Sequence, residues 1–515
     1  ITTHIMIFEI LMFLLTTLVF YYLYTYVRLQ LEFKEKGVKF LPGVPFFGNM
    51  LQSSFLKRHF LADMDEVYQA FPDDKYVGFF EFTMPVIMVK DPDLIKSIIV
   101  KDFDHFTDHR EFFSEESDPL FAGSLLLMKG KWRHMRSTLS PAFTASKMKY
   151  MMPFVTENVN NVMDFLNDSQ GRDVDVDDLI RRYTNDVIAS AGFGLQVNSV
   201  KDKDNDFYKV VQGIFDFDLR QRMLLIYIEY YFLLQKLGFR LFTDKVYNFF
   251  SNIVTTTIEY RKKQKVVRPD MIQLLMEAKK GNIDTAISQS QHNNFLYITL
   301  FPEWTPDELT GQVFIFFTAG FETSASAMVM SIHELALQPE IQDKLYQECK
   351  KFKELTFENL TELKYMDAVI NETLRKWTPA IIFDRTCTKT YELPPPREGG
   401  KPYVIKRGDI LYNLVNHVQM DPKYWPDPHR FDPDRFSEEN KHKIKPFTFM
   451  PFGIGPRSCI GLRFAIMEIK VLLYHLILNY KIVKTEKTMD PIKMLPHNIN
   501  IRADGGTNTR FVKRL

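Results

Sequence analysis

One cysteine stands in a loop whose residue types could hold it against a flat ligand. Cys459 lies within residues 451–461, which read Pro-Phe-Gly-Ile-Gly-Pro-Arg-Ser-Cys-Ile-Gly. The three glycines remove side chains that would keep the backbone away from such a ligand. Apolar residues recur at helical spacing from Leu462 onward. Cys459 is therefore expected at or just before the N-terminus of a buried helix, where free amides and the helix dipole stabilise a thiolate. Taken alone, a single cysteine is more often a small buried hydrophobe, and it is the surrounding loop that favours a ligand here.

A second motif with chemical potential reads Ala-Gly-Phe-Glu-Thr at residues 319–323. Gly320 costs a helix about 1 kcal/mol relative to alanine, so its presence needs a reason. Gly320 and Thr323 share one helix face, where a small residue beside a hydroxyl forms a notch with a polar floor. The residues alone leave an alternative open, in which Gly320 relieves a helix–helix contact and Thr323 bonds back to a carbonyl.

Two charged pairs at helical spacing could also matter. Trp132 and Arg136 are four residues apart, and both are pure hydrogen-bond donors suited to a carboxylate ligand. The alternative is a tryptophan that covers an arginine stem. Glu372 and Arg375, three residues apart among apolar neighbours, are predicted to form a partly buried structural cluster with Arg435.

The elements that must position these residues are mostly helices. Thr305, Pro306 and Glu308 form a strong helix start, and the next proline is Pro339. A helix from 306 to about 337 would be roughly 48 Å long and should cross the core. Short β-rich runs at 76–90 predict a hairpin. The expected fold class is mainly α with small β-sheets, in one large catalytic domain.

The N-terminus is predicted to be a membrane anchor. Residues 1–27 are mainly apolar, long enough to span a bilayer, and contain no Lys or Arg; Glu9 interrupts the run near its end, where a charge is tolerated. Positive charges follow from Arg28, which places the remainder of the chain in the cytoplasm. A cleaved secretory signal fits less well, because the apolar stretch is too long and the charge lies on its other side. We expect an anchor at 1–27, a basic and proline-rich hinge at 28–48 and the catalytic domain at 49–515.

Composition excludes several classes of protein. The 515 residues carry 65 basic and 64 acidic side chains, a net charge of +1, so a nucleic-acid partner is not expected. Three cysteines exclude a disulfide framework and a four-cysteine zinc site, and they fit a reducing compartment.

The loop spacing Phe452-x-x-Gly455-x-x-x-Cys459-x-Gly461, with Arg457 inside it, resembles the haem-ligand loop of the cytochrome P450 family. The resemblance covers nearly the whole chain in the expected order, from the N-terminal anchor through the Trp-Arg and Ala-Gly-x-Glu-Thr helices to the cysteine loop. It implies the cytochrome P450 fold and a haem b whose iron is ligated by the Cys459 thiolate.

The resemblance also assigns roles to individual residues. Thr323 would hydrogen-bond dioxygen, Glu322 would belong to the proton-delivery path, and Ala319 and Gly320 would shape the oxygen notch. The expected haem-binding residues are Cys459, Trp132, Arg136, Arg385, Arg457, Phe452, Gly453 and one of His109 and Arg110. Relatives often carry arginine at the position of His109, so which of these two neighbours reaches a propionate stays open.

The implied activity is that of a microsomal monooxygenase. Electrons would come from NADPH through cytochrome P450 reductase, with cytochrome b5 as a further donor, at the endoplasmic reticulum membrane. Lipophilic substrates and the bilayer would meet the aromatic region 213–241. The sequence is similar to those of insect enzymes that metabolise xenobiotics, so plant toxins or insecticides are the expected substrates. Three alternatives remain. The protein could be a biosynthetic enzyme for one sterol, hormone or fatty acid, an isomerase or dehydratase, or a non-enzymatic haem-binding membrane protein.

Overall fold

The computed structural model describes residues 2–111, 113–114, 118–215, 221, 236, 240–268, 270–279, 304–498 and 500–514. The chain divides into two compact units, and each is described by itself. Unit 1 comprises Ile1–Arg110, Ile382–Val418 and Pro446–Thr448. Unit 2 comprises Glu111–Ile381, Gln419–Lys445 and Phe449–Leu515. Long helices with small sheets confirm the predicted fold class.

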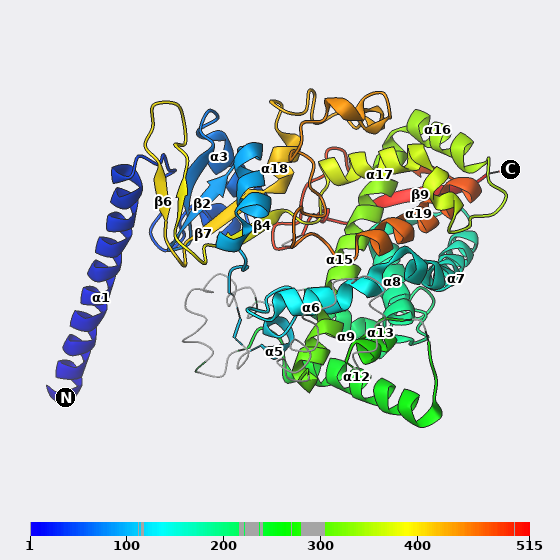
Figure 1. Cartoon of the computed structure of the whole chain (residues 1–515), viewed down its shortest axis with the longest axis horizontal. Helices are drawn as coiled ribbons and strands as arrows, with labels where there is room; N and C mark the ends of the chain where they lie inside the picture. The colour runs from blue at the N-terminus through cyan, green and yellow to red at the C-terminus, as the bar shows by residue number, and fades with distance from the viewer. Residues whose placement is uncertain are drawn as a thin grey trace, which may run out of the picture. The chain divides into compact units, whose positions relative to one another are not determined.

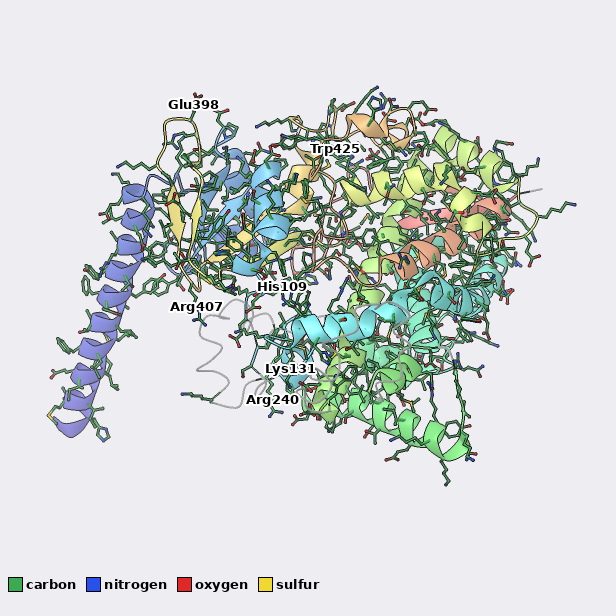
Figure 2. All side chains as sticks on the ribbon, in the orientation of Figure 1. His109, Lys131, Arg240, Glu398, Arg407 and Trp425 are labelled. Carbon is green, nitrogen blue, oxygen red and sulfur yellow. The ribbon has the colours of Figure 1, made fainter. Side chains whose placement is uncertain are left out.

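Helix α1 (Thr2–Glu35) of unit 1 contains the predicted anchor and continues beyond it. Within its stretch His4–Glu35 an 18-residue window has a mean hydropathy of 2.1, and by length and composition the helix could cross a membrane. Figure 2 shows its side chains spread around the helix axis. Near its C-terminal end Tyr26 and Phe33 are buried. The Phe33 ring packs so closely on β1 (Tyr76–Glu81) that a Cβ on Gly78 would lie 3.0 Å from it.

A four-stranded sheet forms the centre of unit 1, in the order β1-β2-β7-β4. β1 and β2 (Met84–Val89) pair antiparallel, which confirms the predicted hairpin. β2 is parallel to β7 (Ile410–Leu414), which pairs antiparallel with β4 (Ile382–Thr386). A second, two-stranded sheet joins β5 and β6. The remaining described α-helices and strands of the unit are α2 (Leu51–Ser54), α3 (Phe60–Gln69), α4 (Pro92–Lys96), β5 (Tyr391–Leu393) and β6 (Tyr403–Ile405), and short π- and 3-10 helices follow α4 at Ser97–Lys101 and Phe103–His105.

Helix α15 (Pro306–Leu337) is the central helix of unit 2. Beside it lie α8 (Val176–Ile188), α17 (Lys364–Lys376) and α19 (Leu462–Asn479) (Figure 1). Its predicted start is confirmed by a capping box. The Thr305 hydroxyl accepts a hydrogen bond from the Glu308 amide at 3.0 Å, and the Glu308 carboxylate accepts one from the Thr305 amide at 2.9 Å. α15 is also apolar enough to cross a membrane, but 78% of that stretch is buried in protein, as expected of a core helix.

The other elements of unit 2 surround α15. In the residues that the structure describes, its α-helices besides α15 are α5 (Pro119–Ala122), α6 (Trp132–Leu139), α7 (Ala145–Ser169), α8 (Val176–Ile188), α9 (Asp206–Phe215), α12 (Asp244–Gln264), α13 (Met271–Lys279), α16 (Pro339–Cys349), α17 (Lys364–Lys376) and α19 (Leu462–Asn479). Its sheet has the order β3-β9-β8, from Asp173–Asp175, Asn508–Lys513 and Tyr480–Lys484. Helix α18 (Val415–Met420) includes residues of both units.

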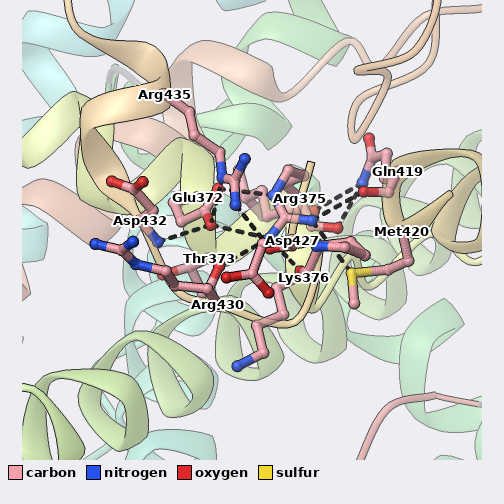
Figure 3. Close-up of polar contacts among 12 residues, drawn as sticks. Glu372, Thr373, Arg375, Lys376, Gln419, Met420, Asp427, Arg430, Asp432 and Arg435 are labelled. Atoms are coloured by element: carbon pink, nitrogen blue, oxygen red, sulfur yellow. Dashed lines mark hydrogen bonds and ion pairs between the residues drawn. The ribbon is translucent and has the colours of Figure 1, made fainter. Parts of the chain in front are cut away.

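The predicted structural cluster is present, with Glu372 and Arg375 fully buried and Arg435 partly exposed (Figure 3). The Arg375 guanidinium donates two hydrogen bonds to the Glu372 carboxylate, at 2.7 and 2.9 Å. It also donates to the carbonyl oxygens of Gln419 at 2.9 Å and Pro428 at 2.7 Å. Arg435 approaches the same carboxylate to 3.5 Å. The cluster thereby ties α17 to the last turn of α18, at Gln419, and to the irregular segment that follows it, at Pro428.

The segment that begins at Gln419 leads to the cysteine loop. The Gln419 side chain accepts a hydrogen bond from the Met450 amide at 2.8 Å, and it donates to the carbonyl oxygens of Leu374 and Arg375. Helix α17 therefore holds the chain at the residue immediately before Pro451. The position of the cysteine loop within unit 2 depends on this buried polar network.

Candidate active site

The cysteine loop is a compact turn stabilised by its own backbone. The Cys459 amide donates to the Phe452 carbonyl at 2.8 Å, and the Gly453 amide donates to Met450 at 3.0 Å. Gly453 and Gly455 have φ of 67° and 76°, a left-handed conformation that strains other residues. Two of the loop's glycines are thus required by the turn itself. Helix α19 begins three positions after Cys459, as the sequence predicted.

The Cys459 thiol has exposed surface, whereas Cys349 and Cys387 are buried. The dense protein around it nevertheless raises its pKa, by burial. The amides of Gly461 and Leu462 and the charge of Arg136 oppose that rise without cancelling it. The predicted stabilising amides are present, but a thiolate here needs the charge of a metal ion to form fully.

Three of the predicted carboxylate donors gather around this loop in unit 2. The Arg457 guanidinium lies over the Trp132 ring, 4.0 Å from its centroid, a cation–π contact. It also donates to the carbonyl oxygens of Leu125 and Leu126 at 3.2 and 3.1 Å. Arg136, one helical turn after Trp132, is close enough to Cys459 for their charges to interact. Spacing alone could not show the Arg457–Trp132 contact.

The remaining predicted donors belong to unit 1 and meet around Asp384. His109 Nδ1 lies 2.9 Å from the Asp384 carboxylate, and the Arg110 amide donates to the same carboxylate at 2.6 Å. Burial alone would raise the pKa of Asp384, but the charge and hydrogen bonds of His109 and the Arg110 amide hold it at about 2. Asp384 is therefore an ionised anchor for this segment.

His109 and Arg110 have different surroundings. The Arg110 guanidinium binds the Glu81 carboxylate and donates to the Tyr412 hydroxyl at 2.8 Å. Arg385 Nη1 lies 3.4 Å from His109 Nδ1. Arg385 Nε is buried and has no hydrogen-bond partner among the residues that the structure describes. A buried guanidinium with a spare donor suits a carboxylate ligand.

The α15 motif shows the helix contact and the back-bonded threonine that the sequence left open as an alternative. A Cβ on Gly320 would lie 2.9 Å from Ile188 Cδ1 on α8, so this glycine does permit a close helix contact. The Thr323 hydroxyl donates to the Ala319 carbonyl at 2.6 Å. Ala319 and Thr323 are nevertheless exposed in the middle of an otherwise buried helix. The local packing explains Gly320, while the exposed pair leaves a polar notch on the helix surface.

Glu322 lies on a different side of α15 from Thr323, buried against α8. Its carboxylate binds the Arg181 guanidinium, which also donates to Asp177 at 3.0 Å. Arg502 donates to the same Asp177 carboxylate at 2.9 Å. Sequence reasoning missed Arg181 and Arg502. The Asp177–Arg181 spacing of four was a usable signal, but nothing in the sequence connects either residue to Glu322.

Phe143 links the cysteine loop to α15. A Cβ on Gly461 would lie 4.0 Å from the Phe143 ring, which packs on Phe316 with ring centroids 5.5 Å apart. Phe316 is one turn before Gly320 on α15. The cysteine loop and the notch-bearing helix are thus connected through one aromatic side chain within unit 2.

Other predicted site regions are only partly described. Of the aromatic region 213–241, the structure describes residues 213–215, 221, 236 and 240–241. The prediction that this region meets substrate and membrane therefore falls mostly outside the described residues.

The residues present fit a haem. A cysteine sulfur is a suitable soft ligand for iron, and Trp132, Arg136, Arg457 and Arg385 are cationic or N–H donors for carboxylates. The helical fold and the cysteine loop define a haem-thiolate protein. The chain belongs to the cytochrome P450 family, because the pattern described as "Cytochrome P450" matches residues 38–504.

Insect proteins are similar over nearly their full length. Cytochrome P450 9e2 of Blattella germanica is 39% identical over 499 residues, covering 92% of both chains. Probable cytochrome P450 9f2 of Drosophila melanogaster is 38% identical over 503 residues, covering 94% of this chain and 95% of the relative. Cytochrome P450 6k1 of Blattella germanica is 34% identical over 522 residues, with 98% and 97% covered. The chain is therefore a haem-thiolate oxidoreductase of the monooxygenase class.

Proposed function

We propose that this enzyme inserts one oxygen atom of O2 into lipophilic xenobiotics such as plant toxins or insecticides. NADPH supplies the electrons through cytochrome P450 reductase, and cytochrome b5 is a further donor. The gathering of Cys459, Trp132, Arg136 and Arg457 in one unit carries this proposal. The similarity to insect P450s of the 9 and 6 groups supports the xenobiotic substrate class.

Cys459 is the proposed axial ligand, and a thiolate-ligated haem supplies the electron density that favours O–O cleavage. Trp132, Arg136, Arg457 and Arg385 are the proposed propionate donors, and Phe452 and Gly453 form the loop that faces the haem. His109 is favoured over Arg110 for a propionate, because Glu81 and Tyr412 already engage the Arg110 guanidinium.

The exposed strip of α15 is the proposed oxygen side. Ala319 and Gly320 leave space, and the Thr323 hydroxyl turns from the Ala319 carbonyl to hydrogen-bond dioxygen. Glu322 organises the proton path through its pair with Arg181. The exposure of Ala319 and Thr323 supports this assignment, since the helix residues from Ser324 to Ala336 are all buried.

The proposed location is the endoplasmic reticulum membrane, with the catalytic domain in the cytoplasm. Helix α1 provides a single-pass anchor, and the positive charges that begin at Arg28 stay on the cytoplasmic side. We retain the division into an anchor at 1–27, a hinge at 28–48 and a catalytic domain at 49–515. The first part of that hinge is helical, because α1 extends to Glu35.

A reconstituted turnover assay tests the substrate class. The full chain is combined with NADPH, cytochrome P450 reductase and a panel of unrelated lipophilic compounds, sterols and fatty acids. Oxidation of many unrelated compounds, dependent on NADPH and the reductase, is expected. Turnover of one sterol or fatty acid alone would reject the xenobiotic assignment in favour of biosynthesis. Product formation without NADPH or reductase would reject the electron route.

Thr323→Ala is expected to uncouple NADPH consumption from product formation. Loss of the hydroxyl removes the group that directs protons toward dioxygen, and such groups contribute about 10²–10⁴-fold to rates. Product formed per NADPH should fall by about tenfold or more, while peroxide rises. Thr318→Ala is the matched control, because Thr318 also bonds back along α15, to Phe314 at 3.0 Å, but is buried. Equal coupling in the two variants would remove Thr323 from the oxygen site.

A further inference from the structure

Four charged side chains of unit 2 form a continuous row, of which the proposed site uses only Glu322 and Arg181. The Glu322 carboxylate on α15 binds the Arg181 guanidinium on α8. Arg181 Nε also donates to Asp177 Oδ2 at 3.0 Å, and Arg502 Nε donates to the same oxygen at 2.9 Å. Acid and base therefore alternate from Arg502 to Glu322, and each link in this charge row is a direct hydrogen bond.

The buried members of the charge row need the charge of Arg502. Asp177, Arg181 and Glu322 are buried, whereas the Arg502 side chain is 25% exposed. Two acids and one arginine alone would leave an uncompensated negative charge in the interior, which is strongly unfavourable. Burial alone would raise the pKa of Asp177, but Arg181 and Arg502 together hold it below its usual value. Arg502 thus supplies the second positive charge that the two acids require.

The contact between Arg181 and Glu322 is single. It joins only Nη1 of Arg181 to Oε2 of Glu322. Nη2 of Arg181 and Oε1 of Glu322 are buried and have no hydrogen-bond partner among the residues that the structure describes. A two-pronged contact would fix the guanidinium plane, but a single one leaves its direction to the other partner of the arginine. That partner is Asp177. Because Asp177 Oδ2 is shared with Arg502, the direction of the guanidinium depends on Arg502 as well.

Arg502 belongs to a loop that also contacts α15. This tail loop, residues 494–503, is closed by an antiparallel bridge between its two end residues. The Ser326 hydroxyl of α15 donates to the Ile501 carbonyl at 3.2 Å. Ser326 is one turn after Glu322, on the same face of the helix. The tail loop therefore meets α15 beside the acid, and it meets α8 through Arg502.

Other charged groups of α8 do not take the place of Arg502. Asp178 binds Arg182 at 2.6 Å. Asp175, at the N-cap of α8, accepts hydrogen bonds from the amides of Asp177 and Asp178. Burial raises the pKa of Asp175, and the negative charge of Asp177 adds to the rise. None of these contacts gives Asp177 a second cation.

We propose that Arg502 is a positioning residue for Glu322, linking the tail loop to the oxygen side of α15. It acts through Asp177 and Arg181. Its charge compensates Asp177, so the Arg181 guanidinium stays directed at the α15 acid. The inference rests on the proposed part of Glu322 in the proton path. Arg502 itself touches no reacting atom and transfers no proton.

Loss of Arg502 should change the protonation of the charge row. Asp177 and Glu322 would then share one guanidinium, and two acids that share one cation titrate as a pair. Removing a cation raises the pKa of the carboxyls beside it. One carboxyl of the pair should therefore take up a proton at a higher pH than in the wild type.

The first test follows this protonation without turnover. Infrared spectra of the full-length wild type and of Arg502→Gln are compared from about pH 5 to about pH 8. An additional carboxylic-acid C=O band is expected in the variant. Adding Glu322→Gln or Asp177→Asn should remove the band, because one acid then remains for one arginine. Arg502→Lys keeps the charge and should show no additional band. An Arg502→Gln spectrum that matches the wild type at every pH would overturn the proposal.

Arg510→Gln is the matched control, since it makes the same substitution at an arginine a few residues farther along the chain. Arg510 of β9 donates to Asp173 of β3 at 2.8 Å, and this pair is not part of the charge row. The wild-type spectrum and wild-type turnover are expected. The same changes in Arg510→Gln as in Arg502→Gln would show a general effect of lost charge and contradict a specific role for Arg502.

The second test measures product formed per NADPH. Arg502→Gln should lower it about fivefold or more, the usual scale of coupling between linked sites, and Arg502→Lys should recover most of the loss. Because Arg502 acts through Glu322, the double variant of Arg502→Gln and Glu322→Gln should lose no more than Glu322→Gln alone. Losses that multiply in the double variant would assign Arg502 a separate structural effect and overturn the proposal.

Failure of the proposed function would look different. If Glu322→Gln keeps wild-type coupling, the role of Glu322 in the proton path fails, while the infrared band of Arg502→Gln still demonstrates the charge row. If Glu322→Gln uncouples but Arg502→Gln does not, the proton path stands and the positioning role is lost. The red-shifted band of the reduced, CO-bound protein should be unchanged in all these variants, because each retains Cys459, and it verifies that each is folded.

Discussion

Cys459→Ala is expected to abolish monooxygenase turnover and to remove the red-shifted band of the reduced, CO-bound protein. No other residue of the loop offers a soft anionic ligand, and the thiolate is what directs electron density toward O–O cleavage. Turnover should fall at least about 10³-fold, which corresponds to about 4 kcal/mol in the activation free energy. The CO-difference spectrum and NADPH-dependent product formation are the two measurements.

Cys349→Ala is the matched control, because it makes the same substitution at a cysteine of the same unit. Cys349 is buried, and burial raises the pKa of its thiol to about 12, so it is inert at neutral pH. The control should keep the CO band and turnover per haem, even where it loses some stability. A red-shifted band that survives in Cys459→Ala, or one that disappears in Cys349→Ala, would contradict the assignment of the ligand.

Local signals in the sequence were sufficient for individual elements. Helix α15 begins at Pro306, where its capping residues predicted it, and ends at Leu337, two residues before Pro339. The cysteine loop lies immediately before α19 for the same reason, because glycines and an apolar helical pattern are both local features. Caps, turns and periodicity act over a few residues, so a sequence displays them directly.

Contacts between distant segments could not be predicted in the same way. Arg457 stacks on Trp132, and Glu322 pairs with Arg181, across 325 and 141 positions of the chain respectively. Such pairs depend on how the helices pack. From the sequence, several acids or aromatic rings are equally compatible partners for each arginine. From their spacing, the sequence analysis paired Trp132 with Arg136. In the structure the cation–π contact on the Trp132 ring is made by Arg457.

Charge states were the least predictable property. The helix N-terminus led us to expect a stabilised thiolate, yet burial outweighs the amides at Cys459. Glu468 stands in an apolar helical run, where its type suggests an exposed position, but the helix is buried on all sides around it. Desolvation depends on the complete packed environment, which no short pattern contains.

Arg375→Ala is expected to destabilise unit 2 by about 3–5 kcal/mol, the cost of breaking a buried ion pair by removing one partner. Arg375 and Glu372 are both fully buried, and the guanidinium also satisfies the carbonyl oxygens of Gln419 and Pro428. Among the described residues, its removal leaves the carboxylate with the Asp432 amide and the more distant Arg435. The urea midpoint, measured at equal haem content, gives the change in the free energy of unfolding.

A nearby exposed pair provides the control for this substitution. Lys344 binds Asp434 at 2.8 Å, but both side chains are more than half exposed, so Lys344→Ala should cost no more than about 1 kcal/mol. Arg375→Lys tests the geometry, since lysine keeps the charge but cannot form the two-pronged contact. A loss in Arg375→Ala no larger than that in Lys344→Ala would show that the cluster contributes little.

The pH dependence of the Arg375→Ala defect distinguishes a lost charge pair from lost packing. Burial raises the pKa of Glu372, with Arg375 opposing the rise, so removing Arg375 should raise it further. A raised carboxyl pKa means that the folded state binds more protons than the unfolded state, so the stability it contributes is lost as pH rises. The defect of Arg375→Ala should therefore be smallest at acidic pH, where Glu372 is neutral, and should grow as pH increases above the usual carboxyl range. A defect that is the same at all pH values would assign the loss to packing and to the two carbonyl oxygens, since those contacts do not titrate.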